Sequence, residues 1–237
     1  MRNRRKRRED ASSRASRPDH MHSYCRVIGC PKPARAGTTD GLDRKFCRSH
    51  ADHYQRHGSP YRGSFTAAEI EPFRRQALDW LTGNREDPFV DNAIARVEGL
   101  YRRAGPHVEA FRLRGLSPAD RAKAHWARLR ERCVDPMRVI AAWLAVDMAI
   151  AADPQIRDDP GYRRVQAAKL VHRMASGTHK RWTREEPDPN RPGHRRTATT
   201  EMHVYPRSRG RVLRYIGRDL EGAVELVADR FGGVVHG

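Results

Sequence analysis

Four residues near the N-terminus have the types and spacing that suit a metal ion. Cys25 and Cys30 are separated by four residues, Cys47 and His50 by two, and sixteen residues lie between the two pairs. Zinc prefers thiolate and imidazole ligands, and two short-spaced pairs joined by a loop can close a tetrahedron around it. The spacing therefore predicts one Zn2+ held by Cys25, Cys30, Cys47 and His50, with no open position for a catalytic water.

Two other interpretations of these residues stay open. The cysteines can be free thiols that lie near a histidine by chance, whereas a disulfide is disfavoured because three nearby cysteines leave one unpaired. His53 competes with His50 as the fourth ligand. The isolated Cys133 is expected to be a small buried residue rather than a nucleophile.

The cysteine pairs lie in a longer run that resembles a known kind of module. The run Cys25-Arg-Val-Ile-Gly-Cys30-Pro is followed by Phe46-Cys47-Arg-Ser-His50 and Arg56-His57-Gly58-Ser59-Pro60. It resembles small treble-clef-like zinc fingers of bacterial phage and mobile-element proteins, some of them attached to HNH endonucleases. The resemblance covers residues 25–63 only, and it implies the same four zinc ligands and an association with nucleic acid. An HNH-type Asn/His constellation is not found, so nuclease activity is not expected.

The composition is consistent with a polyanionic partner. The 237 residues include 47 basic and 29 acidic ones, with a net charge of +18, and 38% are apolar. Such an excess favours nucleic acid as a partner, although an arginine bias can also arise from GC-rich coding. No run of about 20 apolar residues is present, so no membrane span is expected. The absence of an apolar N-terminal signal favours a cytoplasmic, bacterial protein, associated with the nucleoid if it binds DNA.

The elements that must position these residues are predicted to be mainly α-helical. Thr66 and Glu69 form a capping box, and four Asp-Pro or Ser-Pro pairs mark further helix starts. The helical periodicity predicts helices over 66–82, 88–104, 106–114, 118–132, 136–152 and 160–182, and an amphipathic C-terminal helix over 208–231.

The predicted organisation is a small zinc-binding module followed by a multi-helix domain. The segments are a disordered basic arm (1–24), the zinc module (25–63), the helical domain (66–184), a linker or loop (185–200), a short strand with the C-terminal helix (201–231), and a flexible tail (232–237).

Basic residues in the last two predicted helices are candidates for phosphate contact. They are Arg163, Arg164, Lys169, Arg173, Lys180 and Arg181 on 160–182, and Arg207, Arg211 and Arg214 in the C-terminal segment. A helix with one apolar face and one unopposed basic face can lie along a phosphate backbone. The alternatives are a solvated face or salt bridges to neighbouring helices.

The sequence predicts a non-catalytic, zinc-containing nucleic-acid-binding protein of a phage or mobile element, with DNA favoured over RNA. The alternative is a structural or assembly protein in which zinc is a staple and the helical body binds a protein partner or a second copy. A nuclease or recombinase subunit is a third and weaker hypothesis.

Overall fold

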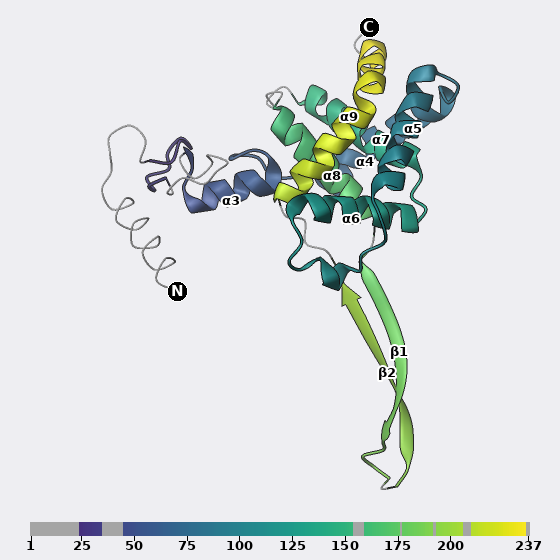
Figure 1. Cartoon of the computed structure of the whole chain (residues 1–237). Coiled ribbons are helices and arrows are strands. Elements are labelled where there is room, and N and C mark those ends of the chain that lie inside the picture. The colour runs from purple at the N-terminus through teal and green to yellow at the C-terminus, as the bar shows by residue number, and fades with distance from the viewer. Residues whose placement is uncertain are drawn as a thin grey trace.

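The structure, a computed structural model, describes residues 24–34, 45–153, 159–175, 177–191, 193–205 and 210–235 (Figure 1). The mainly α prediction is confirmed for this part of the chain. Its elements are α3 (Arg48–His57), α4 (Ala67–Gly83), α5 (Pro88–Arg103), a short 3-10 helix η1 (Ala110–Leu113), α6 (Pro118–Glu131), α7 (Pro136–Ala152), α8 (Pro160–Met174), β1 (Thr178–Pro187), β2 (Arg195–Val204) and α9 (Gly210–Val235).

Capping side chains fix where the helices of the body begin. The Thr66 hydroxyl accepts from the Glu69 N–H, and the Glu69 carboxylate accepts from the Thr66 N–H, so the predicted capping box is present. Each of the four predicted caps before a proline accepts a hydrogen bond from a free N–H of the first turn, and these residues are Asp87, Ser117, Asp135 and Asp159. The helix starts are therefore set locally by the sequence.

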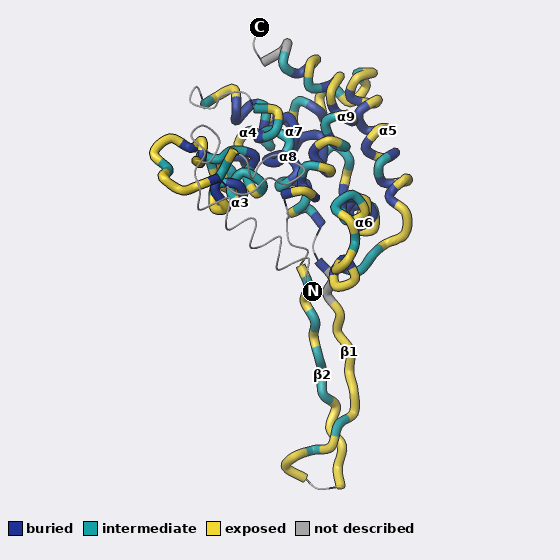
Figure 2. The backbone as a smooth tube through the Cα atoms, turned by 60° about the vertical axis from the view of Figure 1, so that its left-hand side comes forward, coloured by how far each residue is buried: buried dark blue, intermediate teal, exposed yellow. Residues whose placement is uncertain are grey.

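Helix α7 forms the centre of the body. Its residues from Val139 to Val146 are all buried, and α4, α5, α8 and α9 pack around it. Figure 2 shows this buried centre, with exposed residues on the outer sides of the surrounding helices. The helix predicted over 136–152 therefore supplies the centre of the core.

Helix α9 packs within this same core. The predicted apolar stripe is fully buried, and its residues are Leu213, Ile216, Leu220, Val224 and Val227. The helix contacts α5, α6, α7 and α8, and Trp126 of α6 donates a hydrogen bond to Asp219 at 2.9 Å. The last helix is thus part of the helical body.

The predicted helix over 160–182 is wrong beyond Met174. Residues Thr178–Pro187 instead form β1, which pairs antiparallel with β2 over its whole length, from Thr178 opposite Val204 to Pro187 opposite Arg195. At the base of the hairpin, a Cβ on Gly177 would lie 2.0 Å from the Val204 carbonyl oxygen, so only glycine fits. The hairpin projects from the helical body (Figure 1).

Three smaller predictions also differ from the structure. The segment 185–200, expected to be a linker, contains the end of β1, the turn and much of β2, so the short strand expected at 201–205 begins earlier. The helix expected over 106–114 is reduced to η1. Cys133 is exposed and has a left-handed φ of 48°, because it follows the end of α6 in a tight turn rather than lying in the core.

Helix α3 is attached to the body through the start of α8. Gly58 has a φ of 81°, and a Cβ there would lie 2.6 Å from the Tyr162 Cα. The backbone after α3 and the start of α8 therefore approach as closely as glycine allows. Gln166 donates to the His57 carbonyl at 2.7 Å, and the Tyr162 hydroxyl donates to the Gly63 carbonyl at 3.0 Å. Among the described residues, none of the helices combines the length and hydropathy needed to cross a bilayer.

Candidate metal centre

The four predicted ligands lie together in space. The atoms that would bind a metal are all within 4.8 Å of one another. His50 Nδ1 lies 3.2 Å from Cys25 Sγ and 3.5 Å from Cys47 Sγ, and the Cys30 and Cys47 sulfurs are 3.9 Å apart. A tetrahedral ion with metal–sulfur bonds of about 2.3 Å separates its sulfur ligands by about 3.8 Å. The spacing of the atoms therefore fits one small ion between them.

A turn presents the first two ligands. The Cys30 N–H donates to the Val27 carbonyl at 3.0 Å, and Gly29 has a φ of 77°, which favours glycine. The Cys25 N–H donates to the Lys32 carbonyl at 2.9 Å, which closes the turn behind the ligands. Both thiols therefore face the same side of a rigid loop.

The start of α3 presents the other two ligands. Cys47 is the N-cap residue, and His50 lies in the first turn, where residues three apart share a face. Burial acts to raise the pKa of both Cys25 and Cys47, and the pKa of Cys25 is raised overall. For Cys47, hydrogen bonds from the backbone N–H groups of His50 and Ser49 and from neighbouring thiols outweigh burial, so its pKa is lowered overall. Since a metal binds the thiolate, these backbone groups favour the binding form of Cys47.

His53 has a different partner. Its Nε2 donates to the Arg62 carbonyl at 2.9 Å, and its ring lies 4.4 Å from that of His57. The structure therefore groups His50, and not His53, with the three thiols, because His53 faces the segment that follows α3.

The module has a very small core. Cys25, Val27 and Cys47 are buried, and Phe46 packs against them and stacks on Tyr54 at 5.5 Å. Tyr24, which directly precedes Cys25, is 51% exposed and lies outside this core. Because so little apolar surface is buried, a bound metal would supply much of the folding free energy.

Four of the predicted phosphate-binding residues are paired with carboxylates. The ion pairs are Arg163–Asp147 at 2.9 Å, Arg164–Glu221 at 2.6 Å, Lys180–Glu109 at 3.0 Å and Arg181–Glu201 at 3.6 Å. Lys180 and Arg181 lie on β1, so they do not share a helical face with Lys169 and Arg173. The partners come from distant elements, and sequence spacing gave no indication of them.

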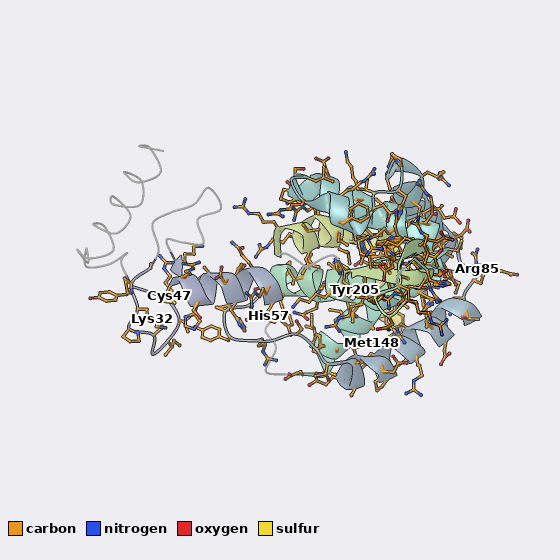
Figure 3. All side chains as sticks on the ribbon, turned by 90° about the horizontal axis from the view of Figure 1, so that it is seen from below. Lys32, Cys47, His57, Arg85, Met148 and Tyr205 are labelled. Atoms are coloured by element: carbon orange, nitrogen blue, oxygen red, sulfur yellow. The ribbon has the colours of Figure 1, made fainter. Side chains whose placement is uncertain are left out.

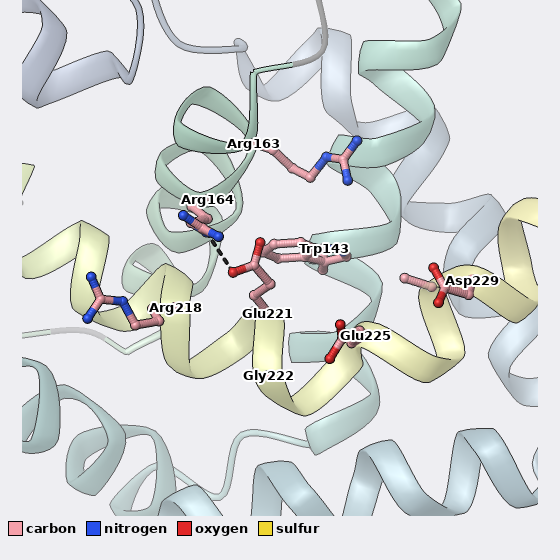
Figure 4. Close-up of a pocket in the computed structure, with 9 residues that line it drawn as sticks. Trp143, Arg163, Arg164, Arg218, Glu221, Gly222, Glu225 and Asp229 are labelled. Atoms are coloured by element: carbon pink, nitrogen blue, oxygen red, sulfur yellow. Dashed lines mark hydrogen bonds and ion pairs between the residues drawn. The ribbon is translucent and has the colours of Figure 1, made fainter.

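A pocket of about 480 Å³ between α8 and α9 shows the same mixing of charge (Figure 4). Arg163, Arg164 and Arg218 line it together with Glu221, Glu225 and Asp229, and the wall includes Trp143. The lining contains both acidic and basic groups, so the pocket is not suited to a polyanion.

The remaining candidates have varied surroundings. Lys169 is partly buried where α8 meets the end of α3, whereas Arg173 is exposed one turn further along. The Arg214 guanidinium lies over the Tyr54 ring at 4.9 Å, and Arg211 is exposed at the start of α9. Arg207 lies outside the described residues. The nucleic-acid contacts of all these residues stay predictions.

The candidates for phosphate contact named from the sequence did not include the basic residues of the segment 25–63 itself. Five of them are exposed, and none forms an ion pair with a carboxylate of the described part of the chain; they are Arg26, Lys32, Lys45, Arg48 and Arg56. The signal was present in the sequence as an excess of eight basic over three acidic residues across 25–65. Figure 3 shows Lys32 and Cys47 at one end of the molecule and Arg85 at the other.

Comparisons with protein-family models, curated proteins and solved structures found no match to this chain.

Proposed function

We propose that this protein is a zinc-containing, non-catalytic nucleic-acid-binding protein that prefers DNA and serves a phage or bacterial mobile element. The observation that carries this proposal is the charge around the metal centre. In residues 24–34 and 45–63, six basic residues accompany a single carboxylate, Asp52. A compact metal-stabilised module with such a surface suits a phosphate backbone.

The donor set supports zinc as the ion. Three thiols and an imidazole are soft to borderline ligands, which suit zinc and disfavour magnesium or calcium, whose preferred ligands are oxygens. Four protein ligands fill a tetrahedron, so the ion would have a structural role. The treble-clef-like type of the module rests on the resemblance of residues 25–63 and is part of the proposal.

Binding to phosphates predicts a strong dependence on salt. Each phosphate neutralised by a lysine or arginine releases counterions, and six such contacts would lower the affinity by roughly a thousandfold between about 50 and 200 mM salt. The test is fluorescence anisotropy of a labelled DNA duplex titrated with zinc-loaded protein over a salt series. No binding at the lowest salt would overturn the proposal.

A pair of matched variants locates the surface. The triple variant Arg26→Glu, Lys32→Glu, Arg48→Glu should weaken binding at least about tenfold, because three phosphate contacts are lost. The control Arg75→Glu, Arg85→Glu, Arg102→Glu makes the same change of charge at residues that are paired with body carboxylates. Equal losses in both variants would mean that net charge alone governs binding.

One observation favours the alternative of an assembly protein. A single face of the hairpin carries Trp182, Ala198 and Met202, and Trp182 is 44% exposed. Such a face could bind a protein partner or a second copy. Light scattering on the purified protein after a high-salt wash, with the 260/280 nm absorbance ratio, tests this: an oligomer free of nucleic acid that does not bind DNA would favour assembly.

A further inference from the structure

Three polar side chains from three separate segments meet where the metal-binding module joins the helical body. Lys169 Nζ of α8 contacts Ser64 Oγ of the connecting segment and lies 3.1 Å from His57 Nδ1 at the end of α3. Ser64 Oγ and His57 Nδ1 are 2.9 Å apart. All three side chains are partly buried, so the cluster is accessible from solvent while being held by its surroundings.

Two arginines add positive charge to this cluster. Arg173 follows Lys169 by one helical turn on α8, and Arg56 directly precedes His57 on α3; both are exposed, and both charges help to lower the pKa of Lys169. Burial is the larger cause, and together these effects bring that pKa to about 8. The pKa of His57 falls to about 4 through burial and then through the charges of Lys169, His53 and Arg56. Burial is the larger effect on both groups, and the neighbouring cations add to it.

No described carboxylate forms an ion pair with Lys169, Arg56 or Arg173. Like charges brought together and partly removed from water destabilise one another. Elsewhere on α8 and β1, four basic residues each lie beside a carboxylate, and they are Arg163, Arg164, Lys180 and Arg181. The junction lacks one, and a bound anion would supply the missing charge.

The chemistry of the donors suits a phosphate group. The Lys169 ammonium has three donors, two of which are directed to Ser64 and His57, and the Ser64 hydroxyl has one donor. The two guanidinium groups offer planar forks that match phosphate oxygens. The backbone around the cluster is well fixed, because Gln166 donates to the His57 carbonyl at 2.7 Å and Gly58 packs against the start of α8.

We propose that Lys169, Ser64, Arg56 and Arg173 form a phosphate-binding site at the junction of the module and the helical body. This inference rests on the proposed function in that the phosphate would belong to a nucleic-acid backbone. A free phosphate has the same chemistry, and the experiment separates the two sources.

The experiment measures how fast an amine-reactive reagent modifies each of the six lysines, by mass spectrometry of the full-length, zinc-loaded protein. The probes are inorganic phosphate and a short DNA duplex, each compared with chloride at equal ionic strength. Lys169 should be protected at least several-fold by either probe, whereas Lys123, exposed on α6, should be unaffected by phosphate. In parallel, Lys169→Met should reduce the slope of log affinity for DNA against log salt by about one, and Lys123→Met should leave it unchanged.

Each outcome has one meaning. Protection by both probes with the reduced slope supports the site and the function together. DNA binding without protection of Lys169 by either probe overturns the site and leaves the function. Protection by phosphate without DNA binding supports the site for a free phosphate and overturns the function. Because Lys169→Met changes a partly buried residue, Arg173→Gln on the exposed surface serves as a second variant, and an unchanged slope in both overturns the site.

Discussion

His50 and His53 lie close together on α3, yet their rings have different partners. His50 faces the three cysteine sulfurs, and His53 donates to the Arg62 carbonyl. The geometry therefore separates a candidate metal ligand from a residue that holds the following segment.

Replacing each histidine tests this separation. His50→Ala should abolish stoichiometric zinc, because three thiols leave the tetrahedron incomplete. His53→Ala should keep the metal and lose one hydrogen bond, at a cost of about 1 kcal/mol. Metal content after gel filtration, measured by elemental analysis, distinguishes the two. A zinc-free His53→Ala protein with a zinc-loaded His50→Ala protein would reverse the assignment.

The four cysteines should differ in reactivity for the same reason. Cys133 is exposed, whereas the other three belong to the metal cluster. In the zinc-loaded protein one thiol should react rapidly with a chromogenic disulfide reagent, and four should react after a chelator removes the metal. Cys133→Ser should abolish the fast phase and leave the slow one. Four fast thiols without a chelator would mean that the cluster holds no metal.

Two stacked histidines in the body, His125 and His172, make the stability of the protein depend on pH. His125 and His172 stack at 5.0 Å beside Arg128, and both His125 and Arg128 are almost fully buried. Burial is the main cause that lowers the pKa of His125 well below its usual value and that of His172 to about 4. Both histidines are therefore neutral in the folded protein.

The sign of the effect follows from proton uptake on unfolding. Between pH 6.5 and about 4 the unfolded chain binds protons that the folded protein excludes, so stability falls as the pH falls through this window. His172 alone would contribute roughly 3 kcal/mol at the acidic end. Urea unfolding at several pH values should show that His172→Gln loses less stability on acidification than the wild type. The exposed variant His194→Gln should lose as much stability as the wild type. Parallel curves for all three would contradict this account.

At the scale of elements, the crossing of α8 and α9 depends on one glycine. A Cβ on Gly217 would lie 2.5 Å from the Arg164 carbonyl oxygen of α8, while Gly222 on the same helix has open space. Gly217→Ala should therefore destabilise the body by about 2 kcal/mol or more through overpacking. Gly222→Ala should instead stabilise it by about 0.5 to 1 kcal/mol through helix propensity. Thermal unfolding of the two variants provides the comparison, and equal effects would show that the close crossing is unimportant.

The elements also show what the sequence could and could not predict. Caps such as Thr66 and Asp135 act within three residues, so the helix starts were predictable. The grouping of the four candidate metal ligands was predictable too, because they lie in two short local pairs. The hairpin was missed because β1 is stabilised by pairing with β2, a partner that lies beyond the turn. The pairing of Arg164 with Glu221 was missed because the two residues are 57 positions apart. Features that depend on neighbours in the sequence could be predicted, and features that depend on contacts between distant residues could not.

At the scale of the whole molecule, the hairpin is the element least integrated into the body. Its strands are largely exposed (Figure 2), and its described contacts with the body lie near its base, such as Lys180 with Glu109. Most of its charges are paired within the hairpin: Arg181 with Glu201, Arg195 with Glu185, and both Arg184 and Arg196 with Glu186. An isolated two-stranded ribbon is marginally stable in water, so the pairs that join the two strands, which are all of these except Arg184–Glu186, help it to persist.

Removing the hairpin tests whether the proposed nucleic-acid surface lies on the module or on the hairpin. Replacing residues 178–204 with a short Gly-Ser linker should leave the unfolding free energy of the body within about 1 kcal/mol, because the hairpin covers none of the core around α7. Affinity for DNA should also change little, since paired charges release few counterions and the proposed phosphate contacts lie on the module and at its junction with α8. A large loss of DNA affinity in this variant, with the body still folded and zinc still bound, would transfer the nucleic-acid surface from the module to the hairpin. If instead only the oligomeric state changes, the exposed face around Trp182 is a protein-docking surface that acts independently of the metal centre.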